Sequence, residues 1–181
     1  MRLLVRTCVA VVLTATSGLA QSVGRDFVST DISTFTAGVI CTPVLLGQTV
    51  APDTIAGHTN QIGGEVHFSS ASRRVPAVEG LSFGVRAATK MQDYPRVIMT
   101  VSHPPMGNQG TTQQSWPMEL VAENDRISLF SFQHDYELVR GAWSFEARSG
   151  ETVLYRANFE VVDPTQVPEL ADMCGFAEML S

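Results

Sequence analysis

The segment His103-Pro104-Pro105-Met106 places two soft-metal ligands three residues apart. An imidazole nitrogen together with a thioether sulfur suits copper, and His134 is a further candidate nitrogen ligand. One His-x-x-Met pair is not specific, however. The two prolines are more simply explained as the end of a strand followed by a loop. We therefore expect no metal at this loop, and keep copper or zinc handling as the alternative function.

Ser82 lies in the string Gly80-Leu81-Ser82-Phe83-Gly84, which matches the G-x-S-x-G pattern of a nucleophile elbow. That motif works only on a sharp turn between a strand and a helix. Here the apolar and polar residues keep alternating through the motif, and no helical pattern follows before Pro95. We expect Ser82 within a strand, on its polar face, and interpret the match as chance.

Two further sets bring an acid close to an imidazole: His134-Asp135, and Glu65 with His67. Adjacent strand residues point to opposite faces, so only Glu65 and His67 would share a face. Neither set has a third converging group for acid–base catalysis. No zinc-protease string and no phosphate-binding loop occurs in the sequence. The prediction is a protein that is not an enzyme and needs no cofactor.

Trp116 follows a polar run and precedes Pro117, a combination typical of an edge strand. A tryptophan exposed there would anchor a partner or a glycan, whereas the alternative is ordinary core packing. With His103 and Met106, it forms the candidate partner-binding set. The expected partner is a protein, a peptide or an envelope component.

Residues 1–20 have the pattern of a cleavable secretory signal. Arg2 and Arg6 form a basic start, an apolar core follows, and Gly18 and Ala20 supply the small residues before the cleavage point. The apolar stretch 7–20 is 14 residues long, shorter than the ~20 that a spanning helix needs. We expect cleavage near Ala20, no membrane insertion afterwards, and a periplasmic or further secreted protein.

Cleavage removes two of the 12 basic residues and none of the 18 acidic ones, which leaves a formal charge of −8. With Lys90 as the single lysine, nucleic acid is a poor partner. Cys8 leaves with the signal, and the remaining pair, Cys41 and Cys174, predicts a disulfide in an oxidising compartment. Closing so long a loop would stabilise the fold by about 4–5 kcal/mol on the chain-entropy model.

Apolar and polar residues alternate with period two over much of the chain after residue 65. The pattern predicts an all-β, antiparallel, immunoglobulin-like sandwich of seven to eight strands. We expect an N-terminal segment at 21–34, the sandwich at 35–162, and a C-terminal tail at 163–181 tied back by the disulfide. Residues 42–64 are predicted to be the loosest part. Other expected elements are a short helix at Pro168–Cys174, a hairpin at Ala142–Val162, and strands at Phe35–Cys41, Glu65–Ser69, Leu81–Ala88, Arg96–Ser102, Gln114–Leu120 and Ile127–Phe132.

Several of these strands carry a familiar pattern, in the segments Val75–Val85 and Asp135–Val162 and at His103-Pro104-Pro105. The pattern resembles that of an uncharacterised bacterial exported family, domain of unknown function 3859, over roughly Phe35–Val162. The resemblance implies a sandwich framework and an export context, and it supplies no catalytic residue. The leading expectation is a non-enzymatic binding or accessory module that uses the loops at 42–64 and 103–115 or an edge strand.

Overall fold

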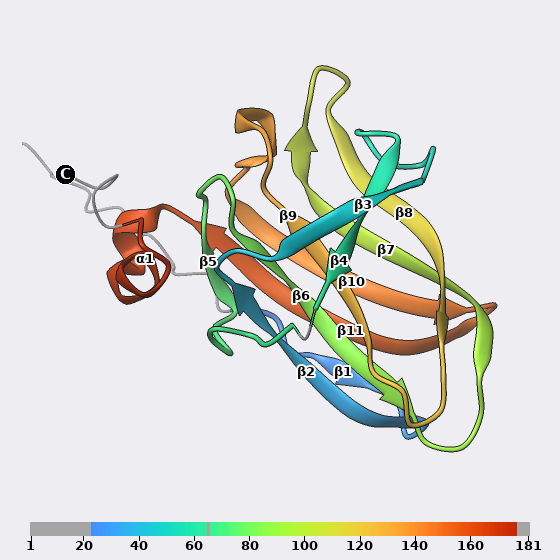
Figure 1. Ribbon diagram of the computed structural model, residues 1–181. Helices are drawn as coiled ribbons and strands as arrows, with labels where there is room; N and C mark the ends of the chain where they lie inside the picture. The colour runs from blue at the N-terminus through green and yellow to red at the C-terminus, as the bar shows by residue number, and fades with distance from the viewer. Residues whose placement is uncertain (1–22, 65, 177–181) are drawn as a thin grey trace, which may run out of the picture.

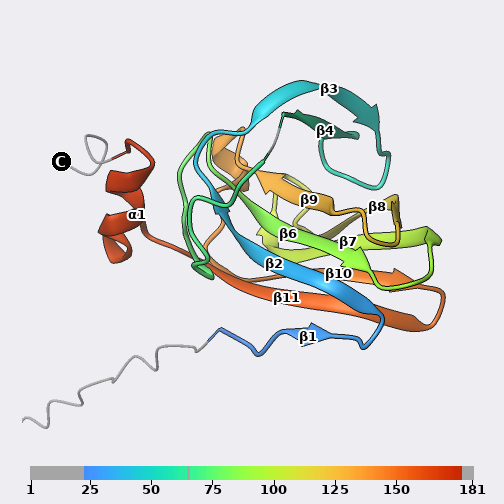
Figure 2. The same cartoon turned by 60° about the horizontal axis from the view of Figure 1, so that its bottom comes forward.

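The computed structural model describes residues 23–64 and 66–176, so the predicted signal peptide lies outside the described residues. Two mainly antiparallel sheets face each other (Figures 1 and 2). The larger sheet has the order β1 (Phe27–Val28), β11 (Thr152–Val162), β10 (Gly141–Ser149), β7 (Tyr94–Met106) and β8 (Thr111–Leu120), with β5 (Arg74–Pro76) parallel to β11. The smaller has the order β2 (Ile32–Ile40), β6 (Ser82–Thr89) and β9 (Arg126–Ser131). The predicted all-β antiparallel sandwich is confirmed, but the described residues form eleven strands where seven to eight were expected.

The core lies between the sheets and is centred on Phe83 of β6, which is fully buried. Inward side chains from the two sheets interdigitate because strand residues alternate between faces. Five aromatic rings lie 5.2–6.1 Å from the Phe83 ring, those of Phe130, Phe132, Trp143, Phe145 and Phe159. All five pairs are tilted or edge-to-face, the geometry that aromatic quadrupoles favour.

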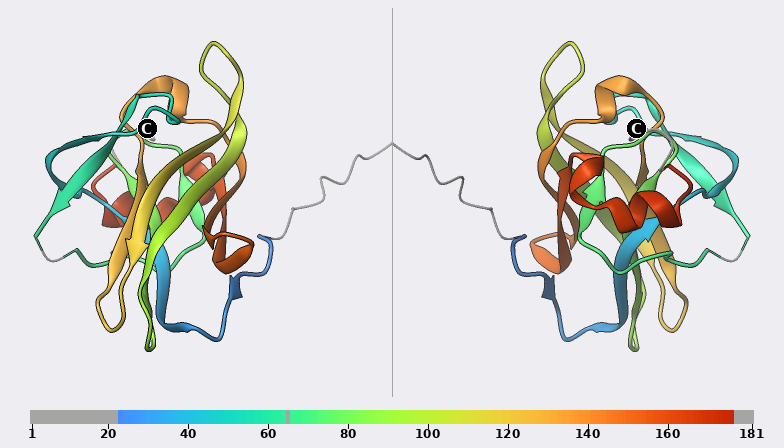
Figure 3. Two further views of the ribbon diagram at one scale, coloured as in Figure 1. Left: turned by 90° about the vertical axis from the view of Figure 1, so that its right-hand side faces the viewer. Right: turned by 90° about the vertical axis from the view of Figure 1, so that its left-hand side faces the viewer.

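A third, two-stranded sheet is a hairpin of β3 (Val44–Val50) and β4 (His58–Gly63). Most of the segment 42–64, expected to be the loosest part of the chain, therefore forms strands. A bulge between Leu45 and Gly47 shifts the β3 register, which hides the period of two in the sequence. Figure 3 shows the hairpin projecting from one flank of the sandwich.

Two local expectations are wrong. His103-Pro104-Pro105 does not end a strand, because β7 runs through these residues to Met106. The pairing of β7 with β8 shifts its register between Ser102 and Met106. The bulge removes these prolines from the regular ladder, which is why they are tolerated there. The predicted strand at Glu65–Ser69 is not formed over its described residues, 66–69.

Residues from the predicted N-terminal segment join the sandwich: β1 pairs with β11, and β2 begins at Ile32. At the other end, α1 (Pro168–Met173) forms where a short helix is expected, and Gly175 follows with φ +77°. The disulfide Cys41–Cys174 is confirmed, with the two Cα atoms 4.9 Å apart. It joins the chain just after β2 to the residue just after α1. In the part of the chain described here, no helix has the length and apolar character to cross a membrane.

Candidate functional site

The β3–β4 hairpin spans the gap between β8 and β9, the outermost strands of the two facing sheets. Three hydrogen bonds hold it there. The Ser115 amide donates to the Asp53 carbonyl (3.1 Å), and the Ile55 amide donates to Gln114 Oε1 (2.9 Å). Within β4, Asn60 Nδ2 donates to Gln133 Oε1 (2.9 Å). The hairpin shares no β-ladder with either sheet among the described residues, so side chains and its tip loop position it.

The outer strand of the hairpin, β3, presents apolar side chains to solvent. Val44 is 62% exposed, Leu46 71% and Val50 82%, and Leu45 is also exposed. One edge of β3 pairs with β4, while the other has no partner strand within the described residues. Scattered exposed apolar residues are ordinary, but four on one strand that also has an open edge form an exposed apolar patch.

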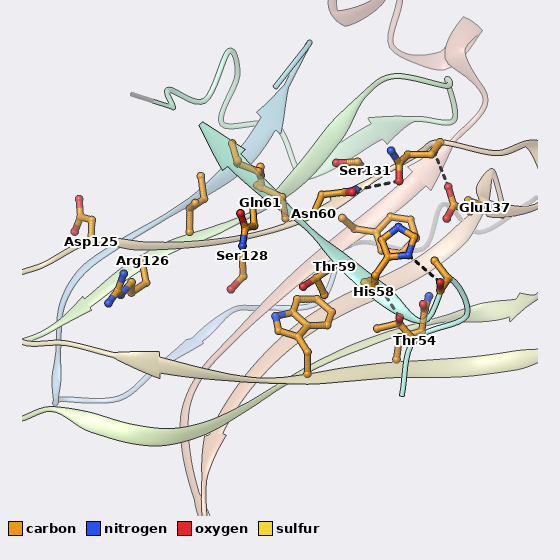
Figure 4. Close-up of a pocket in the computed structure, with 18 residues that line it drawn as sticks. Thr54, His58, Thr59, Asn60, Gln61, Asp125, Arg126, Ser128, Ser131 and Glu137 are labelled. Atoms are coloured by element: carbon orange, nitrogen blue, oxygen red, sulfur yellow. Dashed lines mark hydrogen bonds between the residues drawn. The ribbon is translucent and has the colours of Figure 1, made fainter. Parts of the chain in front are cut away.

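A cleft of about 440 Å³ lies beneath the hairpin. Figure 4 shows it running from Asp125 and Arg126 at one end to Asn60, Ser131 and Glu137 at the other. Its walls come from β4, β8 and β9. Eight of the 18 lining residues carry a hydroxyl or amide side chain, and Trp116 and Phe130 contribute aromatic surface.

His103 is buried in β7 and linked to the hairpin through Gln114. Its ring lies against Trp143, with 4.9 Å between ring centroids. Burial is the main cause that lowers the pKa of His103, while the Pro104 carbonyl, 2.8 Å from Nδ1, opposes the shift. Gln114 Nε2 also lies 3.9 Å from Met106 Sδ. The structure therefore brings His103 and Met106 together, but as buried neighbours of one amide and not on an exposed loop.

Glu137 closes one end of the cleft and is 7% exposed. Its Oε2 accepts hydrogen bonds from the amides of Gln133 (2.6 Å) and His134 (3.0 Å), and so caps the short 3-10 turn Asp135–Glu137. Burial raises the pKa of its carboxyl, although the two amides act in the opposite direction.

The other predicted site residues lie in different places. His134 stacks on Tyr136, with 5.1 Å between ring centroids, whereas His103 contacts Trp143 and Gln114. Trp116 is half-buried, packs partly against the core and also lines the cleft. No group of three or more His, Cys, Asp or Glu side chains is arranged to hold a metal among the described residues.

Ser82 begins β6 and is fully buried, so its predicted place on a polar face is wrong. Its hydroxyl lies 2.6 Å from that of Ser131 on β9, which satisfies it inside the protein. Glu65 lies outside the described residues, so its predicted pairing with His67 receives no structural account.

Sequence reasoning missed the β3–β4 hairpin, Gln114 and Glu137. A run of uncharged residues, Val44–Val50, ahead of the glycine- and proline-rich tip was the available signal for the hairpin. Nothing local marks Gln114 or Glu137, because their roles depend on contacts with distant segments or on burial.

Comparisons with known proteins identify a family but no activity. The model of the family described as "Domain of unknown function (DUF3859)" matches residues 30–161. No protein among the curated ones matches. One matching solved structure is an immunoglobulin-like protein from Pseudomonas aeruginosa, with 17% sequence identity and a TM-score of 0.49, covering 79% of this chain and 99% of that one.

Proposed function

Since the chain belongs to the family described as domain of unknown function 3859, which names no activity, we propose a function from the chain's own surface. It is an exported, non-enzymatic binding module that takes up an extended polypeptide segment of an envelope protein or peptide. The segment adds as a strand to the open edge of β3.

The observation that carries this proposal is the combination of exposure and an unprotected edge in β3. Soluble proteins usually blunt a free edge with lysine, proline or a strong twist, because an open edge invites pairing with another chain. The sequence Val44–Val50 contains no charged residue and no proline. By contrast, β8, an edge strand of the larger sheet, contains Pro117, whose nitrogen cannot donate a backbone hydrogen bond.

Strand addition would use both features of β3. Its unpaired backbone groups supply hydrogen bonds, and its exposed apolar side chains supply selectivity for alternating apolar residues in the partner. The formal charge of the predicted mature chain, −8, disfavours an acidic partner by long-range repulsion. The partner segment is therefore extended, apolar on one face, and neutral or basic in net charge.

The periplasm is the proposed compartment. The secretory pattern of residues 1–20 and the Cys41–Cys174 disulfide support it, since disulfides persist in oxidising compartments. Cell fractionation followed by N-terminal sequencing tests this directly. The expected mature protein begins at Gln21 in the periplasmic fraction; an intact N-terminus in the cytoplasm would contradict it.

Selection from a displayed library of random short peptides tests the binding function. Val50→Lys places a charge on the open edge, while Met91→Lys places the same charge at a residue that is 92% exposed on the turn between β6 and β7. We expect peptides selected on the unmodified protein to bind Met91→Lys equally and to lose at least about tenfold in affinity for Val50→Lys. Equal binding to both variants would contradict β3 as the site.

A further inference from the structure

The cleft beneath the hairpin is a second site, and we propose that it binds one or two rings of a neutral oligosaccharide. The cleft is separate from the outer edge of β3, so this proposal does not depend on strand addition. Its volume of about 440 Å³ falls in the range of small-ligand sites.

The lining fits a ligand that is polar around its rim and uncharged. Thr59, Asn60 and Gln133 line the cleft with groups that donate or accept hydrogen bonds. Asn60 Nδ2 is bonded to Gln133 Oε1, which leaves Asn60 Oδ1 as an acceptor and Gln133 Nε2 as a donor without a further partner among the described residues. Asn60 Oδ1 can therefore accept a hydrogen bond from one sugar hydroxyl, and Gln133 Nε2 can donate one to the adjacent hydroxyl.

An aromatic surface is the second component that a sugar ring requires. A pyranose ring has faces of C–H groups, which carry slight positive charge, and the face of an indole is electron-rich. Trp116 is half-buried and lines the cleft, so it contributes aromatic surface there. Glu137, at one end, adds a carboxylate that accepts hydrogen bonds from hydroxyl groups.

The charges in the cleft disfavour the competing ligand classes. Arg126 lines it but is ion-paired with Glu119, and Asp125 and Glu137 add negative charge. A nucleotide, a phosphate or a carboxylate ligand would meet these acids, while the Arg126 guanidinium already pairs with Glu119 and keeps a buried Nε without a hydrogen-bond partner among the described residues. A lipid chain would leave the hydroxyl and amide groups without hydrogen bonds.

The two tryptophans give the experiment an internal control. Trp143 is buried and donates its indole N–H to the Val139 carbonyl (3.0 Å), whereas Trp116 lines the cleft. Protein with 15N-labelled tryptophan is titrated with chitotetraose, maltotetraose and cellotetraose as probes. We expect at least one probe to shift the indole N–H signal of Trp116 in a saturable manner, while that of Trp143 stays in place.

A matched pair of variants locates the binding. Trp116→Ala removes the aromatic face and should weaken binding of that probe at least about tenfold, and Trp116→Phe should retain most of it. Thr59→Val, which keeps the shape of the side chain, should weaken binding without loss of the folded state. No saturable shift with any of the three probes up to about 10 mM, or equal shifts at both tryptophans, would overturn the proposal.

Discussion

Nε2 of His103 lies 3.1 Å from Nε2 of Gln114, and this contact defines the charge state of the imidazole. The amide nitrogen of glutamine can only donate, so the histidine nitrogen must accept. The imidazole is then neutral, with its proton on Nδ1 pointing at the Pro104 carbonyl 2.8 Å away. The same Gln114 side chain holds the hairpin through the Ile55 amide, so the buried histidine and the hairpin share one hydrogen-bonded chain.

His103 should titrate below its ordinary pKa of 6.5, because burial penalises the charged ring. The unfolded chain takes up this proton first as the pH falls, so acid below about 6.5 should reduce stability. Nitrogen-15 NMR of the imidazole should show the Nδ1–H form at neutral pH. Exchange of the Ile55 amide should accelerate as His103 becomes charged. An Nε2–H form, or titration above 6.5, would contradict the hydrogen-bond assignment.

Glu137→Gln should stabilise the protein at neutral pH. Burial raises the pKa of the Glu137 carboxyl, so its ionised form costs stability, whereas glutamine can still accept hydrogen bonds from the Gln133 and His134 amides. The gain should shrink as acid protonates Glu137 in the folded protein. Urea unfolding at several pH values measures it, with exposed Glu151→Gln as the control. A loss of stability at neutral pH would show that the charge itself is needed.

Gly84→Ala should destabilise the sandwich by at least about 1–3 kcal/mol. A Cβ atom at Gly84 would lie 2.0 Å from the Ser128 carbonyl oxygen, so β6 or β9 would have to shift. At Gly47, the nearest atom to an added Cβ is the flexible Gln61 Oε1 at 3.4 Å, and Gly47→Ala should be mild. Thermal unfolding of the two variants makes the comparison. Similar losses would show that the sheet relaxes around Gly84 with little cost.

Removal of the disulfide should cost about 2–5 kcal/mol. The bridge ties the segment after α1 to the end of β2 and closes most of the described chain. The double variant Cys41→Ser, Cys174→Ser should unfold at lower denaturant concentration, and a reductant should bring the unmodified protein to the same midpoint. A reductant should leave the double variant unchanged. Equal midpoints in all conditions would mean that the bridge does not stabilise the fold.

The sequence predicted the framework better than the site, for a physical reason. Strands such as β10 and β11 bury one regular face, so their alternation is visible in the sequence alone. The hairpin buries little and contains a bulge, so its pattern is broken. The continuation of β7 through His103 depends on its partner strand β8, and the role of Gln114 depends on His103 and Ile55, which are distant in the chain.

Hydrogen exchange of the β3 amides, measured with a selected peptide bound, shows whether the peptide adds to β3 as a strand. Strand addition predicts slower exchange within Val44–Val50 and unchanged exchange in the β7–β8 turn, residues 107–110. Protection of β3 that disappears in Val50→Lys and persists in Met91→Lys would agree with this account. Protection confined to another edge or loop, with β3 exchanging as in the free protein, would contradict it.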